Sequence, residues 1–205
     1  MNTKPVTLST LAALKQGGER IVALTCYDAS FCRLLEEAGV HVLLVGDSLG
    51  MVIQGHDTTV PVTLDDMVYH SACVARARRQ ALILVDMPFL TYATPDLALA
   101  SAGRLMREGG AQMVKLEGGA PFVETVQRLT TNGVPVCGHL GLLPQSIHRL
   151  GGYRYQGRDR ASALAMLEDA VALQDAGAGL LVLECVPAEL AREIACALRI
   201  PVIGI

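Results

Sequence analysis

Acidic side chains stand at the ends of several apolar segments of this chain. They are Asp47 after Val42–Val45, Asp86 after Leu82–Val85 and Glu184 after Leu180–Leu183. A further segment carries Lys115 and Glu117, two residues apart. Because residues i and i+2 of a strand point to the same face, this ammonium and this carboxylate point the same way. If these segments are strands of one barrel, four carboxylates and one ammonium converge near its top.

Such a group of side chains suits a magnesium site that takes an anionic substrate. Carboxylates without histidine or thiolate partners favour a hard, oxygen-binding cation, of which Mg²⁺ is the default. Lys115 supplies a compact positive charge suited to a carboxylate oxygen or a developing enolate. Simpler interpretations stay open for single residues. Asp47 or Asp86 alone could form a turn or cap a helix, and Glu184 could cap the helix after Pro187.

Seven short apolar segments are predicted to be the strands that position these residues. They are continuous runs rather than alternating ones, as expected for parallel strands covered on both faces. The segments are Ile21–Thr25, Val42–Val45, Leu82–Val85, Gln112–Leu116, Val134–Gly138, Leu180–Leu183 and Val202–Ile205.

Helices are predicted between these strands from the residues that mark their ends. Asp28 and Thr94, the latter followed by a proline, are typical N-caps, and Thr63 to Asp66 resembles a capping box with aspartate in place of glutamate. Glycines just past a helix end permit the left-handed conformation needed there. These glycines are Gly39, Gly109, Gly110, Gly133 and Gly177. The alternation of strand and helix indicates a parallel sheet with right-handed crossovers.

Two α/β architectures compete for this pattern, and the TIM (β/α)₈ barrel is the better interpretation. A doubly wound sheet would normally carry a glycine-rich phosphate turn after the first strand, where this chain has Cys26, Tyr27 and Asp28. A barrel predicts polar residues at the carboxyl ends of many strands, as found here. We expect one domain over residues 1–205. A barrel runs to about 250 residues, so the pattern predicts a barrel truncated after strand seven.

Composition excludes several other classes of protein. Hydrophobic residues make up 51% and charged residues 18%, with a net charge of −3 and no basic run, so neither disorder nor nucleic-acid binding is expected. Residues 1–16 lack the apolar core of a signal peptide, and no apolar stretch is long enough to cross a bilayer. The six cysteines form no C-x-x-C pair. We therefore expect a protein of the reducing cytosol, without a membrane partner.

The histidines and one long glycine-rich segment give weaker signals. His139 follows a predicted strand and is expected to face the site, where it could bind substrate or only hydrogen-bond a loop. The other four histidines have no ligand spacing, and structural or surface roles are expected for them. Residues 139–159 read as a long loop that could act as a lid or a binding loop.

Several motifs together resemble the ketopantoate hydroxymethyltransferase family, in that family's order and over essentially the whole chain. The matching segments are Val45–Met51 with Gln54–Asp57, Asp86–Phe89, Val114–Gly119, Gly138–Leu142 with Pro144–Ser146, and Leu183–Pro187. The family continues beyond residue 205 with a glycine-rich turn and an eighth strand.

The resemblance implies a role for each residue of the site. Asp47 and Asp86 would bind magnesium, with Glu117 as a third acid of the metal site. Asp47, Ser48, Asp86 and Lys115 would contact 3-methyl-2-oxobutanoate, and Glu184 would be the general base. The donor would be 5,10-methylenetetrahydrofolate and the product 2-dehydropantoate, on the path to pantothenate and coenzyme A. A homo-oligomer, usually a decamer, and a cytoplasmic location are implied as well.

The chemistry of a 2-oxo acid agrees with these roles. Magnesium chelated by the keto oxygen and the carboxylate would stabilise an enolate, and Glu184, in an apolar setting that raises its proton affinity, would remove the proton next to the carbonyl. Two rivals remain. One is a carbon–carbon lyase or phosphonate mutase of the isocitrate lyase type, although its active-site cysteine loop is not seen after the middle strands. The other is a non-catalytic scaffold on a degenerate barrel, although idle buried charges would cost stability.

Overall fold

A computed structural model of the chain describes residues 4–152 and 154–205. The chain forms two compact units, Met1–Val114 and Lys115–Ile205, and strand β4 (Met113–Glu117) spans the boundary between them. No helix among the described residues is long and apolar enough to cross a membrane.

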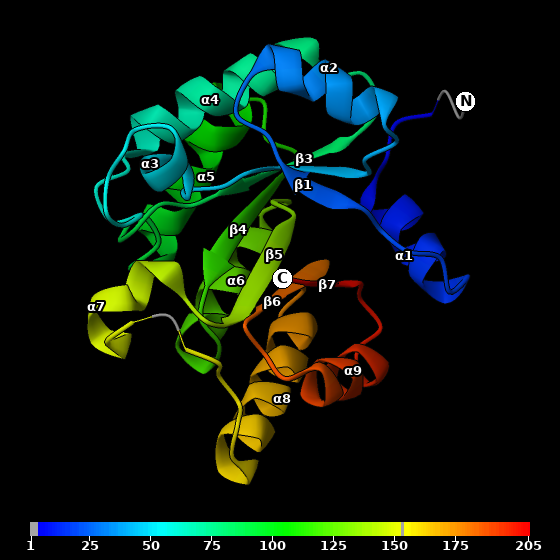
Figure 1. The fold of residues 1–205 in the computed structure, drawn as a ribbon, viewed down its shortest axis with the longest axis vertical. Coiled ribbons are helices and arrows are strands. Elements are labelled where there is room, and N and C mark those ends of the chain that lie inside the picture. The colour runs from blue at the N-terminus through cyan, green and yellow to red at the C-terminus, as the bar shows by residue number, and fades with distance from the viewer. Residues whose placement is uncertain (1–3, 153) are drawn as a thin grey trace. The chain divides into compact units, whose positions relative to one another are not determined.

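The first unit alternates helices with parallel strands (Figure 1). Its elements are α1 (Leu8–Gln16), β1 (Ala23–Thr25), α2 (Ala29–Glu37), β2 (Val42–Val45), α3 (Leu49–Val52), α4 (Leu64–Ala77), β3 (Leu82–Asp86) and α5 (Pro95–Arg107). Strand β2 pairs in parallel with β1 on one side and with β3 on the other. All five residues of β3 are buried, in agreement with its continuous apolar sequence. Helix α4 packs on β2 and β3.

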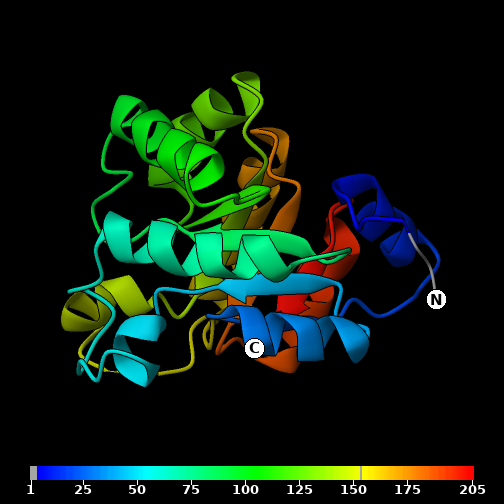
Figure 2. The same cartoon turned by 90° about the horizontal axis from the view of Figure 1, so that it is seen from above.

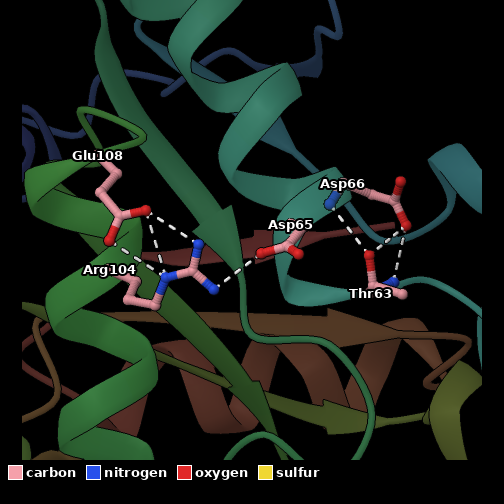
Figure 3. A network of polar contacts seen from close by, with 5 residues as sticks. All are labelled: Thr63, Asp65, Asp66, Arg104 and Glu108. Carbon is pink, nitrogen blue, oxygen red and sulfur yellow. Dashed lines mark hydrogen bonds and ion pairs between the residues drawn. The ribbon is translucent and has the colours of Figure 1, made fainter.

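The helix starts predicted for this unit are confirmed. The Asp28 carboxylate accepts hydrogen bonds from the backbone N–H groups of Ser30 and Phe31, and the Thr94 hydroxyl accepts one from Leu97. Thr63 and Asp66 form a reciprocal capping box at α4 (Figure 3). Beside it, Arg104 of α5 pairs with Asp65 at 2.8 Å and with Glu108 at 2.9 Å. The three N-caps fix where α2, α4 and α5 begin.

One carboxylate joins α2 to the segment that enters β3. The side chain of Glu36 accepts hydrogen bonds from the backbone N–H groups of Arg79, Gln80 and Ala81, at 2.8, 2.6 and 2.7 Å. Helices α2 and α4 lie side by side (Figure 2), and the three bonded residues follow Arg78, the C-cap of α4. Glu36 thus satisfies three backbone donors that the turn leaves outside any ladder.

The second unit repeats the alternation of strand and helix. After β4 it contains the 3₁₀ turn η1 (Ala120–Phe122), α6 (Val123–Thr131), β5 (Val136–Gly141), the 3₁₀ turn η2 (Pro144–Ser146), α7 (Ile147–Leu150), α8 (Arg160–Asp175), β6 (Leu180–Glu184), α9 (Ala188–Ala197) and β7 (Val202–Gly204). Strand β6 pairs in parallel with β5 and with β7. Helices α6 and α8 pack on β5, and α9 packs beside α8.

All seven predicted strands are present, with shifted ends. Strand β1 begins at Ala23 rather than Ile21, while β3 and β6 extend by one residue to include Asp86 and Glu184. The largest difference is in β5, which continues to Gly141 instead of ending at Gly138. Consequently His139 lies inside a strand rather than after one. The predicted long loop over residues 139–159 is also partly structured, because it includes η2 and α7; Tyr153 lies outside the described residues.

Candidate functional site

Asp47 and Asp86 come together in the first unit. The register that pairs Val45 with Val85 places the carboxyl ends of β2 and β3 side by side. The backbone N–H of Asp47 donates a hydrogen bond of 3.1 Å to Oδ2 of Asp86. Each of the two aspartates is only 3% exposed. Buried carboxylates need compensation by hydrogen bonds or by a cation, so this pair is a candidate binding site rather than a pair of surface turn residues.

Ser48 follows Asp47 and contacts a residue that the sequence did not single out. Its Oγ lies 2.7 Å from the phenol Oη of Tyr27, which stands two residues after β1. Burial raises the pKa of Tyr27; the hydrogen bonds with Ser48 and Thr25 lower it in part, and the charges of the two aspartates raise it further. No motif marks Tyr27. Its place at the carboxyl end of a parallel strand is the signal that could have identified it.

Lys115 and Glu117 lie on one face of β4 in the second unit, as predicted. They are buried, with 4% and 3% of their surface exposed, and both reach the imidazole of His139. The Lys115 Nζ lies 3.1 Å from Nδ1 of His139, and Oε1 of Glu117 lies 3.6 Å from the same nitrogen. The second oxygen of Glu117 accepts a 3.1 Å hydrogen bond from the backbone N–H of Gln145, in η2.

His139 links this pair to Glu184. The pairing of β5 with β6 sets Gly141 opposite Glu184, and Nε2 of His139 lies 3.3 Å from Oε2 of Glu184. This approach is a close electrostatic contact rather than an aligned hydrogen bond. Burial raises the pKa of Glu184, and the charge of Lys115 lowers it in part. The second unit therefore brings together Lys115, Glu117, His139 and Glu184.

The capping role considered for Glu184 is wrong. Helix α9 begins after Pro187, and no side chain bonds to its first N–H groups. Only 20% of the Glu184 side chain is exposed. The carboxyl group is thus held at the end of β6 with its proton affinity raised, a combination often found in acid–base catalysis.

The turn after Glu117 is held by a helix that the sequence analysis did not connect with the site. The Asp169 carboxylate of α8 accepts a 2.8 Å hydrogen bond from the backbone N–H of Ala120. The same carboxylate packs against Gly119, where any Cβ atom would collide with it. Gly118 adopts φ +116° and donates its N–H to the His139 carbonyl. The turn therefore requires glycine at both positions, at 118 for the positive φ and at 119 for lack of space.

The donor types at Asp47 and Asp86 fit a magnesium ion. Both are buried carboxylates at neighbouring strand ends, and oxygen ligands of this kind suit a small, hard cation that keeps several waters. No ready-made cluster of three or more His, Cys, Asp or Glu side chains is found within residues 4–152 and 154–205. The predicted metal set, Asp47, Asp86 and Glu117, stays a prediction.

Solved structures identify the class of fold. The chain superposes on 2,3-dimethylmalate lyase, a PEP mutase/isocitrate lyase superfamily member, with a TM-score of 0.68 over 96% of this chain and 70% of that one, at 17% identity. A lyase/mutase from Burkholderia cenocepacia gives a TM-score of 0.68 at 21% identity, over 96% of this chain and 73% of that one. The α/β barrel class predicted from the sequence is confirmed. At these identities the likeness concerns the fold alone.

Sequence comparison then places the chain more narrowly. The family model described as ketopantoate hydroxymethyltransferase matches residues 5–205. A 3-methyl-2-oxobutanoate hydroxymethyltransferase of Methylococcus capsulatus is 63% identical over 99% of this chain and 76% of its own length, and that of Nitrosococcus oceani is 62% identical over 97% and 75%. The chain belongs to the ketopantoate hydroxymethyltransferase family, as its motifs indicated. The lyase interpretation shares the fold but not this sequence similarity.

Proposed function

We propose that this protein transfers a hydroxymethyl group to 3-methyl-2-oxobutanoate, giving 2-dehydropantoate for pantothenate synthesis, with 5,10-methylenetetrahydrofolate as the donor. Family membership and the names of relatives such as those of Methylococcus and Nitrosococcus support the transferase reaction. The structural observation that carries the proposal is the placement of Glu184, a carboxyl group of raised pKa held beside a buried histidine and lysine.

Binding of the 2-oxo acid is assigned to charged and hydroxyl groups. Lys115 offers an ammonium group for the substrate carboxylate or for negative charge that develops on its keto oxygen. Ser48 offers a hydroxyl donor. Asp47 and Asp86 would hold a magnesium ion, with Glu117 as the third acid of the predicted set. When bound, the metal supplies Lewis acidity that makes the hydrogen next to the keto group easier to remove.

Glu184 then acts as the general base at C3 of the substrate. Its carboxylate takes the proton, and the electron pair left at C3 forms a bond to the methylene carbon of the donor. Both C–N bonds from that carbon to the folate break, a water molecule supplies the hydroxyl oxygen, and the two folate nitrogens take up one proton from C3 and one from the water. A base works best when its pKa is close to the working pH. Burial moves the pKa of Glu184 in that direction.

His139 keeps Glu184 in place in this mechanism. As an ammonium group, Lys115 has only donors, so Nδ1 of His139 must accept its hydrogen bond. The proton of a neutral imidazole then resides on Nε2, which is the nitrogen that faces Oε2 of Glu184. At this distance the Nε2–H makes an electrostatic contact that favours one orientation of the Glu184 carboxylate without neutralising it.

Proton exchange at C3 tests the proposed function directly. With magnesium and 3-methyl-2-oxobutanoate in heavy water, proton NMR should show the C3 methine signal fading and the methyl doublet collapsing. Glu184→Gln should slow this exchange by roughly two to four orders of magnitude, the usual range for a positioned general base. Glu189→Gln, an exposed carboxylate of α9, is the matched control and should exchange at the wild-type rate.

Three outcomes would count against this assignment. Exchange at the wild-type rate in Glu184→Gln would make another residue the base, with His139 as the next candidate. Exchange that persists without magnesium would remove the metal from this step. No exchange in the wild type, with or without a tetrahydrofolate analogue, would contradict the proposed reaction itself.

Cytoplasmic location and homo-oligomerisation belong to the same proposal. The described cysteines are all free thiols, which agrees with a reducing compartment. Exposed apolar side chains on α2, Phe31 and Leu34, each 59% exposed, offer surface that an assembly would cover. Sedimentation analysis should give a mass several times that of the 21.7 kDa chain.

A further inference from the structure

We infer that Tyr27 is a positioning residue for substrate binding, and that its phenol fixes the direction in which the Ser48 hydroxyl donates its proton to the anionic 2-oxo acid. This inference rests on the proposed function, because it takes Ser48 as a substrate contact. Neither the sequence motifs nor the roles carried over from the family assign a task to Tyr27.

The two hydroxyl groups are close enough for a strong hydrogen bond. Oη of Tyr27 and Oγ of Ser48 are 2.7 Å apart, the most frequent distance for an O–H···O bond. The parallel pairing of β1 with β2 accounts for this contact, since it sets Thr25 opposite Leu44 and lets the backbone N–H of Cys26 bond to the Leu44 carbonyl. Tyr27 and Ser48 therefore follow neighbouring strands at the same edge of the sheet, and Ser48 directly follows Asp47.

The main chain at Tyr27 is held from two sides. The carbonyl of Tyr27 accepts a 2.8 Å hydrogen bond from Nδ1 of His70, on α4, and the next residue, Asp28, caps α2. The Tyr27 and His70 rings also meet edge to face, with centroids 6.4 Å apart. A phenol on such a support has little freedom, because a tyrosine ring has only two side-chain torsions. Its hydroxyl therefore meets Ser48 at a defined point.

The direction of the hydrogen bond follows from the acidity of the two groups. A phenol is far more acidic than an aliphatic alcohol and is the better donor, so Tyr27 donates and Oγ of Ser48 accepts. A phenol keeps its proton at neutral pH, because its ordinary pKa is about 10. With Oγ engaged as an acceptor, the proton of Ser48 must point away from Tyr27. Gly46 leaves the surroundings of this hydroxyl open, since a Cβ at position 46 would lie only 3.0 Å from Oγ.

A serine whose proton is already directed binds a carboxylate with less loss of freedom than one that rotates. Free hydroxyl rotors place their hydrogen wherever a partner is available. Pre-orientation lowers the entropic penalty of binding. Loss of the Tyr27 hydroxyl should therefore weaken substrate binding through Ser48, while leaving the proton abstraction by Glu184 unchanged.

A double-mutant cycle with Tyr27→Phe and Ser48→Ala tests this coupling. Titration calorimetry of 3-methyl-2-oxobutanoate in the presence of magnesium measures Kd for the wild type, both single variants and the double variant. Ser48→Ala should raise Kd about tenfold, the loss expected for one hydrogen bond to a charged group, and Tyr27→Phe should raise it by up to that factor. The double variant should be no weaker than Ser48→Ala alone, because the two residues act as one unit.

Exchange kinetics separate positioning from a structural effect. In Tyr27→Phe, the KM for C3 exchange should rise in step with Kd while kcat stays near the wild-type value. Tyr69→Phe is the matched control, since that tyrosine is 64% exposed and also meets the His70 ring edge to face. It should leave Kd, KM and the melting temperature unchanged.

Some results would overturn the inference. An unchanged Kd in Tyr27→Phe, or single effects that multiply in the double variant, would show that Tyr27 does not act through Ser48. If Tyr27→Phe lowers kcat or the melting temperature and leaves no separate change in Kd, the residue has a structural role instead. A wild type that binds no 2-oxo acid would instead overturn the proposed function, and this inference with it.

Discussion

His139 and Glu184 show how neighbours set the chemistry of single residues. The imidazole lies between an ammonium on Nδ1 and a carboxylate at Nε2, at 3.1 and 3.3 Å. The two contacts lie on different ring nitrogens, so the ring stands between the cation proposed to bind substrate charge and the carboxylate proposed as the base.

At this scale we expect Glu184→Gln to stabilise the fold at neutral pH. The pKa of Glu184 is raised in the folded state, chiefly by burial. Ionised Glu184 therefore lowers the stability of the fold. This loss begins as the pH rises past the unfolded-state pKa and is complete above the raised folded-state pKa. Below the unfolded-state pKa, about 4.3, both residues are uncharged and the difference should vanish. Melting temperatures between pH 4 and pH 8 would show the gap opening as the pH rises. A constant gap, or a less stable variant at pH 7, would contradict this account.

The negative charge of Asp86 can be removed while its oxygen acceptor is kept. Asp86→Asn keeps an oxygen that can accept the Asp47 N–H but removes the negative charge. We expect the magnesium-dependent part of 2-oxo acid binding to weaken by at least about tenfold, since a hydrogen bond or contact to a charged group contributes about 1.5–3 kcal/mol. Calorimetric titration with and without magnesium would measure it. Asp57→Asn, an exposed aspartate of the same unit, is the control. Equal affinities for wild type and Asp86→Asn would remove Asp86 from the metal site.

Among the helices and strands, Glu36 of α2 by itself accepts three backbone hydrogen bonds from the segment before β3. Glu36→Ala would leave the N–H groups of Arg79, Gln80 and Ala81 without their acceptor. We expect a loss of roughly 2–3 kcal/mol in the free energy of unfolding, from bonds to a charged group. Glu37→Ala, the exposed neighbour, should change it by less than about 0.5 kcal/mol. Urea unfolding would compare the stabilities of the two variants. Equal midpoints would show that the three hydrogen bonds to Glu36 do not stabilise the fold.

The elements also show where sequence reasoning succeeds and where it stops. Local signals were sufficient for all seven strands and for the caps at Asp28, Thr63 and Thr94, because a cap or an apolar run acts within a few residues. Strand ends were less accurate. Strand β5 reaches Gly141 because it pairs with Leu183 and Glu184 of β6, and that ladder depends on a partner about forty residues away in the chain. Helix α1, with its Thr7 capping box, was not predicted at all.

The candidate site divides in the same way. Asp47, Asp86, Lys115, Glu117 and Glu184 carry charge at strand ends, which a sequence displays. Tyr27 and Asp169 act through single contacts, to Ser48 and to the turn at Ala120. Such contacts depend on which elements are neighbours, and no local pattern encodes them.

For the molecule as a whole, we expect every cysteine to be a thiol. None of the six, all of which lie in the described part of the chain, forms a disulfide; Cys26, Cys32 and Cys137 are buried and Cys196 is exposed. Burial raises the pKa of Cys32 to about 12, so it should resist thiolate chemistry until the fold opens. Titration with a chromogenic disulfide reagent should label Cys196 first in the native protein and all six after denaturation without reductant. Fewer than six thiols would reveal an oxidised pair, and rapid native labelling of Cys32 would contradict its burial.

The contact between Asp169 and Gly119 also restricts the order in which this sequence can change. A side chain at position 119 would meet the Asp169 carboxylate, so the carboxylate must be displaced or lost when the glycine is replaced. Losing it first removes the acceptor of the Ala120 N–H, beside the residue predicted to be the third metal ligand. An evolving lineage would therefore pass through an impaired intermediate to leave this pairing. We expect the two positions to covary among relatives, with glycine at 119 wherever 169 is aspartate, and designers of new specificities would have to treat them as one unit.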